Sequence, residues 1–302
     1  MSKFVTIIMM VLVLGFALSL PAQAQKIIGG HDETSEVNNP RWATGAVTPG
    51  VAPALTAIHL LVSEVAVAGT PVEFVEIYNP TTEPVDLSKY YLTDAWYEAP
   101  PAAPSGYYQL PSGLFQITTN TDFCSRFPAG AMIMPNSAIV VALYGAGIDS
   151  AYGAGTADFE VTSSSPVIPD MISVGNNAPP IACGATTLTN GSEFIMLFYW
   201  DGLSDNVCDV DYVTWGSATT TSRVDKTGQS IDGPDADAIA TAYNNDTADA
   251  LQSSVGAPAA PNSTARVLLP EGVEAANGNG CIAGGPTPVR NSTWGDIKVM
   301  YH

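Results

Sequence analysis

The sequence predicts an all-β protein of antiparallel strands, arranged as a sandwich or a barrel. Glycine and proline are frequent, with 27 and 23 of the 302 residues, and only 13% of the residues are charged, so the strong helix formers lysine and glutamate are scarce. Short runs of β-branched and aromatic residues also recur along the chain, and turn-forming residues separate them. Both features favour strands over a helical bundle.

The runs with the composition of strands cover residues 58–65, 72–78, 85–87, 90–94, 116–118, 131–134, 138–144, 193–200 and 207–215. The run 138–144 is the most continuously apolar of them and predicts the buried centre of a sheet. The last two runs are joined through Asp201-Gly202 and predict a hairpin.

Other segments are predicted to lie outside the strands. Four prolines in residues 95–113 exclude a central strand over most of that length and predict a long exposed loop. Residues 235–252 are rich in alanine but contain an Asn-Asn-Asp interruption, which predicts one short helix or none. In the turns, Asn79, Asp86 and Asp94 are placed to accept hydrogen bonds from exposed backbone amides.

The N-terminus has the pattern of a secretory signal peptide. An apolar run over residues 4–20 follows Lys3, and the small-residue sequence Ala22-Gln23-Ala24 supplies a cleavage site, so residues 1–24 are predicted to be removed. The alternative is a short membrane anchor. Residues 25–54 show no sustained periodicity and predict a flexible lead-in. The mature chain is expected to be secreted or held at the cell surface, without a transmembrane segment.

Four cysteines are expected to be structural. An exported chain reaches an oxidising compartment, so an even set of cysteines predicts two disulfides, with three pairings open. None of the spacings is Cys-x-x-Cys, which excludes the usual redox motif and zinc knuckle. The disulfide candidates are Cys124, Cys183, Cys208 and Cys281.

Three ordered segments carry a resemblance to a known family. They are Ser63-Glu64-Val65, residues 73–80 (EFVEIYNP) and residues 84–94 (PVDLSKYYLTD). In this order they resemble the opening of the lamin tail domain, an immunoglobulin-like module that is also found in exported bacterial proteins. Similar segments downstream include residues 191–197 and 211–216, and insertions separate them.

The resemblance covers about residues 55–291. It implies an immunoglobulin-like antiparallel β-sandwich with long loop insertions, followed by a C-terminal tail at residues 292–302. It also implies an interaction module without a catalytic site. DNA binding, which is attributed to some lamin tails, is not expected of this chain. It carries 29 acidic and 10 basic residues, and its net charge of -19 would repel the phosphate backbone.

No catalytic or cofactor-binding residue is predicted. The chain contains three histidines, and no nucleophile elbow, P-loop, zinc-protease or dinucleotide motif occurs. Glu64, Glu73 and Glu76 fall on two runs expected to be adjacent, and paired carboxylates can hydrolyse glycosidic bonds. The lamin-tail resemblance instead explains Glu64 and Glu76 as positions of the fold.

Calcium is the one metal ion that the sequence favours, because loop carboxylates and carbonyls are its preferred ligands. Two acidic loops are dense enough to hold it, although neither fits the EF-hand pattern. Their candidate ligands are Asp201, Ser204, Asp205, Asp232, Asp235 and Asp237. The alternative for each loop is a solvated turn.

A cluster of aromatic residues in the proline-rich loop predicts a binding ledge. Trp96, Tyr97, Tyr107 and Tyr108 could stack on sugar rings or anchor a protein, and the alternative is a small core under the loop. The sequence therefore predicts a non-catalytic binding module for an extracellular protein or glycan. The alternatives are a secreted hydrolase that uses Glu64 and Glu76, and a structural subunit of an extracellular assembly.

Overall fold

The computed structural model describes residues 59–67, 71–95, 106–117, 122–175, 188–217, 222–252, 254–256, 262–266 and 289–293. The predicted signal peptide, the lead-in and most of the predicted C-terminal tail lie outside these residues. In the part of the chain that is described, no helix is both long and apolar enough to span a membrane.

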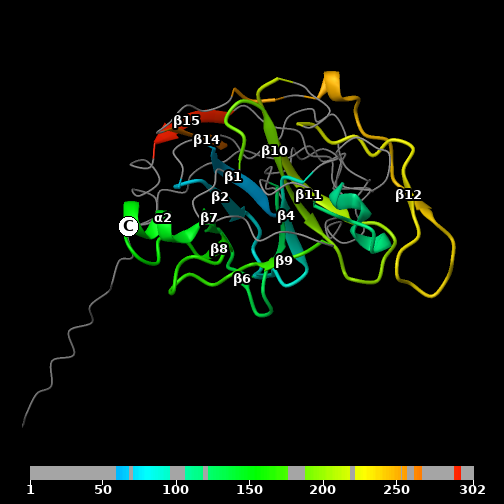
Figure 1. The fold of residues 1–302 in the computed structure, drawn as a ribbon, viewed down its shortest axis with the longest axis horizontal. Helices are drawn as coiled ribbons and strands as arrows, with labels where there is room; N and C mark the ends of the chain where they lie inside the picture. Colours follow the sequence, from blue (N-terminus) through cyan, green and yellow to red (C-terminus); the bar gives the residue numbers. More distant parts are fainter. Residues whose placement is uncertain are drawn as a thin grey trace, which may run out of the picture.

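Two main β-sheets form the fold (Figure 1). The strands of the six-stranded sheet are, in spatial order, β15 (Val289–Thr293), β14 (Asn262–Arg266), β1 (Leu61–Ala66), β2 (Phe74–Asn79), β7 (Ser137–Tyr144) and β8 (Phe159–Thr162). Those of the five-stranded sheet are β11 (Cys208–Trp215), β10 (Glu193–Tyr199), β4 (Tyr90–Thr93), β5 (Cys124–Arg126) and β9 (Ile172–Ser173). Within both sheets every strand pair is antiparallel except β7 with β8.

Smaller elements complete the described part of the chain. Two-stranded ribbons pair β3 (Val85–Asp86) with β6 (Met132–Ile133), and β12 (Ser230–Ile231) with β13 (Thr241–Ala242). The helical elements are the 3-10 helix η1 (Tyr107–Ser112), the α-helix α2 (Gly145–Tyr152) and the 3-10 helix η2 (Asp249–Leu251). The predicted all-β fold is confirmed.

The main core lies between the two sheets. It contains apolar side chains of the six-stranded sheet, such as Val62 and Val141, and of the five-stranded sheet, such as Ile195 and Val213. Alternation places these residues on the facing sides of the sheets, which is the packing of a β-sandwich. The predicted apolar strand β7 lies inside its sheet, between β2 and β8, as expected for a buried centre.

A hydrogen bond joins the two sheets at a β-bulge. The register of β1 against β2 shifts between Val62 and Glu64. The backbone amide of Val62 donates to the Asp211 carboxylate of β11, at 2.6 Å. A buried amide that the bulge removes from the ladder is thereby satisfied.

The segment predicted as an exposed loop at residues 95–113 is partly buried, so this prediction was wrong for its described portion. Residues 107–112 form η1, and Tyr107, Tyr108 and Pro111 are buried. They lie over the outer face of the five-stranded sheet, in a second core with Phe194 and Phe198 of β10. The prolines do exclude a strand, but the neighbouring tyrosines supply apolar area that the sheet covers.

Helix α2 was not predicted, because Gly145 and Gly147 are poor helix formers. Their small size is needed here. A side chain at Gly147 would collide with the backbone oxygen of Pro71, and one at Gly145 would collide with the Glu160 carboxylate. That carboxylate accepts the Gly145 amide, at 3.0 Å. In residues 235–252 the only described helix is η2, as the sequence predicts.

The predicted turn acceptors are confirmed at Asn79 and Asp86. Asn79 Oδ1 accepts the Thr81 amide at 3.0 Å, and Asp86 Oδ1 accepts the Ser88 amide at 2.8 Å. Asp94 differs, because it accepts the distant Phe123 amide at 2.6 Å instead of closing a local turn.

Replacing Asn79 should destabilise the fold far more than replacing Asp86. Asn79 is fully buried, and its side-chain amide also donates to the carbonyls of Glu83 and Ile133, at 2.9 and 3.2 Å. Asn79→Ala leaves these buried groups without partners and should cost about 2–3 kcal/mol in urea unfolding. Asp86→Ala, in an exposed turn, should cost under about 1 kcal/mol. Equal losses would contradict this account of the turn.

Candidate functional site

The two acidic loops named by the sequence meet in the structure. The first joins β10 to β11 at residues 200–207, and the second joins β12 to β13 at residues 232–240. Asp205 of the first loop is buried, and its carboxylate accepts the Gly233 amide at 2.9 Å and the Thr241 hydroxyl at 2.5 Å. This carboxylate therefore fixes the β12–β13 hairpin against the loop before β11. We call the two loops together the loop pair.

Three of the predicted metal ligands come together at the loop pair. Carboxylate oxygens of Asp205, Asp232 and Asp235 lie within 4.8 Å of one another. The sequence treated the loops as separate sites, whereas the structure combines one residue of the first loop with two of the second. Oxygen donors of this kind suit calcium.

The other predicted ligands stay in their own turns. Asp201 Oδ1 accepts the amides of Leu203 and Ser204, at 2.9 and 2.8 Å, and also the Ser204 hydroxyl. Asp237 Oδ1 accepts the Ile239 amide, at 2.8 Å. These contacts order the loops locally, and the carboxylates of Asp201 and Asp237 are not part of the acidic cluster.

Each loop of the pair also exposes a large apolar side chain. Leu203 is 65% exposed and Ile239 is 71% exposed. Exposed apolar side chains beside charged ones on ordered loops are typical of recognition surfaces. No sequence pattern distinguishes these two residues.

Glu64 and Glu76 lie together but are buried. They face each other across β1 and β2 as cross-strand partners, so both point to the same side of the sheet. Their exposed fractions are 1% and 2%. Glu64 accepts the hydroxyl of Ser263, and Glu76 accepts that of Ser63. In the described conformation the two carboxylates serve the packing of the sheet and offer a substrate no access.

The aromatic ledge is not formed by the tyrosines. Tyr107 is fully buried and Tyr108 nearly so, and both pack in the second core. Their prediction as exposed binding residues was therefore wrong, and the alternative of a small core applies to them. Trp96 and Tyr97 lie outside the described residues.

The prediction of two disulfides was also wrong, because Cys124 is a free, buried thiol on β5. Burial raises its pKa, so this thiol is unreactive. Cys208 on β11 is disulfide-bonded. Cys183 and Cys281 lie outside the described residues.

Buried carboxylates gather at one end of the sandwich, and no motif in the sequence predicts this cluster. Asp94 follows β4 and Glu193 begins β10, and both are buried. Burial, together with the charges of Glu193 and Asp122, raises the pKa of Asp94 well above its ordinary value. Burial, with Asp122 and Glu73 nearby, raises the pKa of Glu193 to about 8. Since these residues are far apart in sequence, only the fold brings them together.

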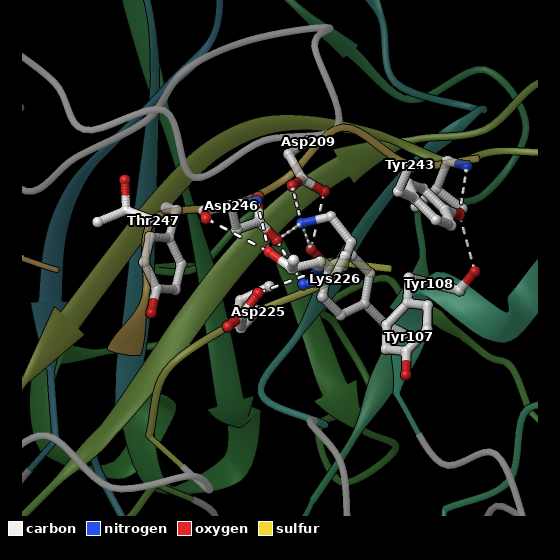
Figure 2. A network of polar contacts seen from close by, with 12 residues as sticks. Tyr107, Tyr108, Asp209, Asp225, Lys226, Tyr243, Asp246 and Thr247 are labelled. Carbon is white, nitrogen blue, oxygen red and sulfur yellow. Dashed lines mark hydrogen bonds and ion pairs between the residues drawn. The ribbon is translucent and has the colours of Figure 1, made fainter. Parts of the chain in front are cut away.

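A second cluster of buried polar side chains surrounds Lys226 (Figure 2). Its ammonium lies 2.7 Å from an Asp209 oxygen and 2.9 Å from an Asp246 oxygen, and the Lys226 side chain is fully buried. The Tyr107 hydroxyl donates to the other Asp209 oxygen, at 2.8 Å. We call Lys226, Asp209, Asp246 and Tyr107 the lysine network. Burial alone would lower the pKa of Lys226, but the two carboxylates outweigh it and raise the pKa.

Comparison with known proteins gives little guidance. No protein-family model matches the chain, and no curated protein matches it. Among solved structures, the chain is similar to a DUF4876 family protein from Bacteroides thetaiotaomicron, with 13% sequence identity and a TM-score of 0.35. The match covers 52% of this chain and 54% of that one, so it spans about half of each protein. A likeness this weak carries no argument about function.

Replacing Asp205 should loosen the β12–β13 hairpin. Asp205→Ala removes the acceptor of the Gly233 amide and the Thr241 hydroxyl, so it should cost roughly 1–3 kcal/mol in urea unfolding. Hydrogen exchange at the Gly233 amide should accelerate at the same time. The exposed Asp235→Ala is the matched control and should change stability by under about 0.5 kcal/mol. Unchanged exchange at Gly233 would show that Asp205 does not hold the hairpin.

The stability of the protein should fall as the pH rises from about 5 to about 8.5. The folded pKa values of Asp94 and Glu193 are raised, and that of Asp246 is about 7, so the folded state holds protons that the unfolded chain has released. Their stabilising contribution is complete below the unfolded values, near 4, and is lost as the pH passes the folded values. Each unit of difference corresponds to roughly 1.4 kcal/mol.

Glu193→Gln tests this pH dependence. The variant removes one titrating group from its acidic neighbours Asp94, Asp122 and Glu73, so its unfolding free energy should fall less steeply between pH 5 and 8.5. Asp94 and Asp246 still titrate, which leaves part of the slope. The exposed Glu83→Gln should keep the wild-type slope. Parallel curves for wild type and Glu193→Gln would refute the assignment.

Proposed function

We propose that this chain is a non-catalytic, secreted or cell-surface binding module of the lamin-tail type. It recognises an extracellular protein or glycan through the loop pair. The observation that carries the proposal is the buried Asp205 carboxylate, which bonds both to Gly233 and to Thr241 and so holds two loops in one fixed arrangement. Fixed loops bind with a smaller loss of conformational entropy than mobile ones.

The positions of the lamin-tail segments support the family proposal. Ser63-Glu64-Val65 lies in β1, residues 73–80 contain β2, and residues 84–94 contain β3 and β4. The first two strands belong to the six-stranded sheet and β4 belongs to the five-stranded sheet. An ordered segment that supplies strands to both sheets is expected of a sandwich domain. The proposed secretion rests on the signal-peptide pattern of residues 1–24.

The alternatives have weaker support. A hydrolase that uses Glu64 and Glu76 needs these carboxylates to reach a substrate, and both are buried and hydrogen-bonded to serines. A structural subunit that assembles through strand pairing needs an accessible edge. The long edge strand β11 is buried at every residue except Cys208, and the exposed strand at the opposite edge of that sheet, β9, has only two residues. These observations favour recognition by loops.

Binding should depend on the exposed apolar residues of the loop pair. The purified protein, fluorescently labelled, is applied to a printed glycan array and to an array of purified extracellular proteins. The double variant Leu203→Ser/Ile239→Ser should lose at least about tenfold of the wild-type affinity for any ligand found. Leu251→Ser, which changes a leucine that is 74% exposed on η2, is the matched control and should bind as wild type does.

Either of two results would overturn the proposal: no binding to either array by folded protein, or wild-type affinity in the double variant.

Thermal melts of the same protein, with calcium and with chelator, test the predicted calcium site. A thermal midpoint that rises with calcium relative to chelator, and that Asp235→Asn no longer shows, would place the ion at the three carboxylates, because a ligand of the native state stabilises it. An unchanged midpoint would reject calcium and leave the loop pair as a recognition surface without metal.

A further inference from the structure

The lysine network places one amine against two carboxylates in an almost completely buried site. The side chains of Lys226 and Asp246 are fully buried, and that of Asp209 is 5% exposed. Tyr107, Tyr108 and Tyr243 of the second core lie beside this network (Figure 2), and the Phe198 ring packs against that of Tyr107. A buried cation with two carboxylates is a costly arrangement for stability alone, because desolvation opposes the attraction of the charges.

The two carboxylates have different surroundings. Asp209 accepts hydrogen bonds at both oxygens, from the Lys226 ammonium at 2.7 Å and from the Tyr107 hydroxyl at 2.8 Å. Asp246 Oδ2 contacts the same ammonium at 2.9 Å and also accepts the Lys226 backbone amide, at 2.6 Å. Asp246 Oδ1 is buried and has no hydrogen-bond partner among the described residues. Asp209 is thus polarised by two donors, while Asp246 keeps one oxygen available for a proton.

Burial raises the pKa of the Asp246 carboxyl to about 7, with the charge of Asp209 adding to the effect and that of Lys226 opposing it. A carboxyl in this range can both accept and donate a proton near neutral pH. Asp246 therefore suits a proton carrier, and Asp209 suits the carboxyl that reacts.

We propose that Lys226 and Asp209 condense to an intramolecular amide bond, with Asp246 transferring the proton and Tyr107 stabilising the reacting oxygen. This cross-link is a covalent modification site of the chain itself. The inference does not depend on the proposed binding function, because it rests on the lysine network and not on the loop pair.

The reaction needs no oxidant, cofactor or leaving group other than water. The Lys226 ammonium first gives a proton to Asp209 Oδ2, which yields a neutral amine and a neutral carboxylic acid. The nitrogen lone pair then attacks Cγ of Asp209, and the carbonyl electron pair moves to Oδ1, where the Tyr107 hydroxyl stabilises the charge. The hydrogen-bonded contact between Nζ and Oδ2 holds the amine beside that carbon.

Asp246 completes the proton transfers. Its carboxylate takes the second proton from Nζ and passes it to the hydroxyl of Oδ2, which leaves as water while the carbonyl reforms. The product is an amide with one N–H, one water molecule and an Asp246 carboxylate in its starting state. The three ammonium protons are accounted for, and the net charge of the site does not change. The surrounding aromatic core then excludes the water that hydrolysis would need.

Mass spectrometry of the purified, reduced and denatured protein tests the cross-link. The wild-type chain should be lighter than its sequence mass by one water molecule. Because Asp201-Gly202 and Asp232-Gly233 could also lose water by cyclising locally, the decisive observation is a chymotryptic peptide pair joined through Lys226 and Asp209, identified by fragmentation. Folding of the same sample is checked by circular dichroism and a cooperative melt.

Variants assign the roles. Lys226→Arg keeps the charge but lacks a nucleophilic amine, and Asp246→Asn keeps the shape but cannot carry the proton, so both should lose the joined peptides. Lys89→Arg, at a lysine that donates to the Asp201 carbonyl near the surface, should retain them. Folded wild-type protein without the joined peptides would overturn the proposal, whatever the variants do. Joined peptides that persist in Asp246→Asn would reject the role of Asp246.

Discussion

The architecture depends on the burial of the five-stranded sheet on both faces. Along β10, Ile195 and Leu197 enter the core between the sheets, whereas Phe194, Met196 and Phe198 enter the second core outside. A strand that is apolar on both sides cannot be the surface of a two-layer sandwich, so something must cover it. The cover is supplied by η1 and by parts of residues 224–243. Their position is therefore a consequence of the composition of β10.

The covering layer determines where the polar side chains go. Asp209 lies on β11, and Lys226 and Tyr107 belong to the cover, so closing the second core takes these polar groups out of water. Each must then find a partner within the core. The lysine network is the result, and it is the point at which the cover is joined to the sheet by charge as well as by apolar contact.

The sequence predicts the longer apolar strands of both sheets, β1, β2, β7, β10 and β11, because alternation and continuous apolar runs report directly on a β-sheet. It does not predict the short or polar strands β5, β8, β9 and β12 to β15, and the run at residues 116–118 was wrongly predicted as a strand. It fails where tertiary packing decides. Tyr107 and Tyr108 follow a proline-rich stretch and give no local sign that an apolar face lies beneath them. Helix α2 contains two glycines, which have a low helix propensity. The close packing of the helix against Pro71 and Glu160 nevertheless requires them.

The same limit applies to the candidate site. Acidic loops are visible in the sequence, but their combination through Asp205 is not, because it depends on the path of the β12–β13 hairpin. Asp94 and Glu193 are ordinary acidic residues until the fold buries them at one end of the sandwich. Long-range pairings of this kind have no local sequence signal, and a buried carboxyl with a raised pKa is recognisable only from its surroundings.

The lysine network and the loop pair both hold the β12–β13 hairpin in place. Lys226 precedes β12 and Asp246 follows β13, so the contacts of Lys226 with Asp246 and with Asp209 clamp the base of the hairpin to β11. Asp205, in the loop that leads into β11, holds the hairpin further along at Gly233 and Thr241. The second acidic loop is therefore fixed at the base of its hairpin and at its two ends, Gly233 and Thr241. A covalent bond between Lys226 and Asp209 would make that clamp permanent, and the loop that carries Ile239 would be presented to a partner with little conformational freedom left to lose.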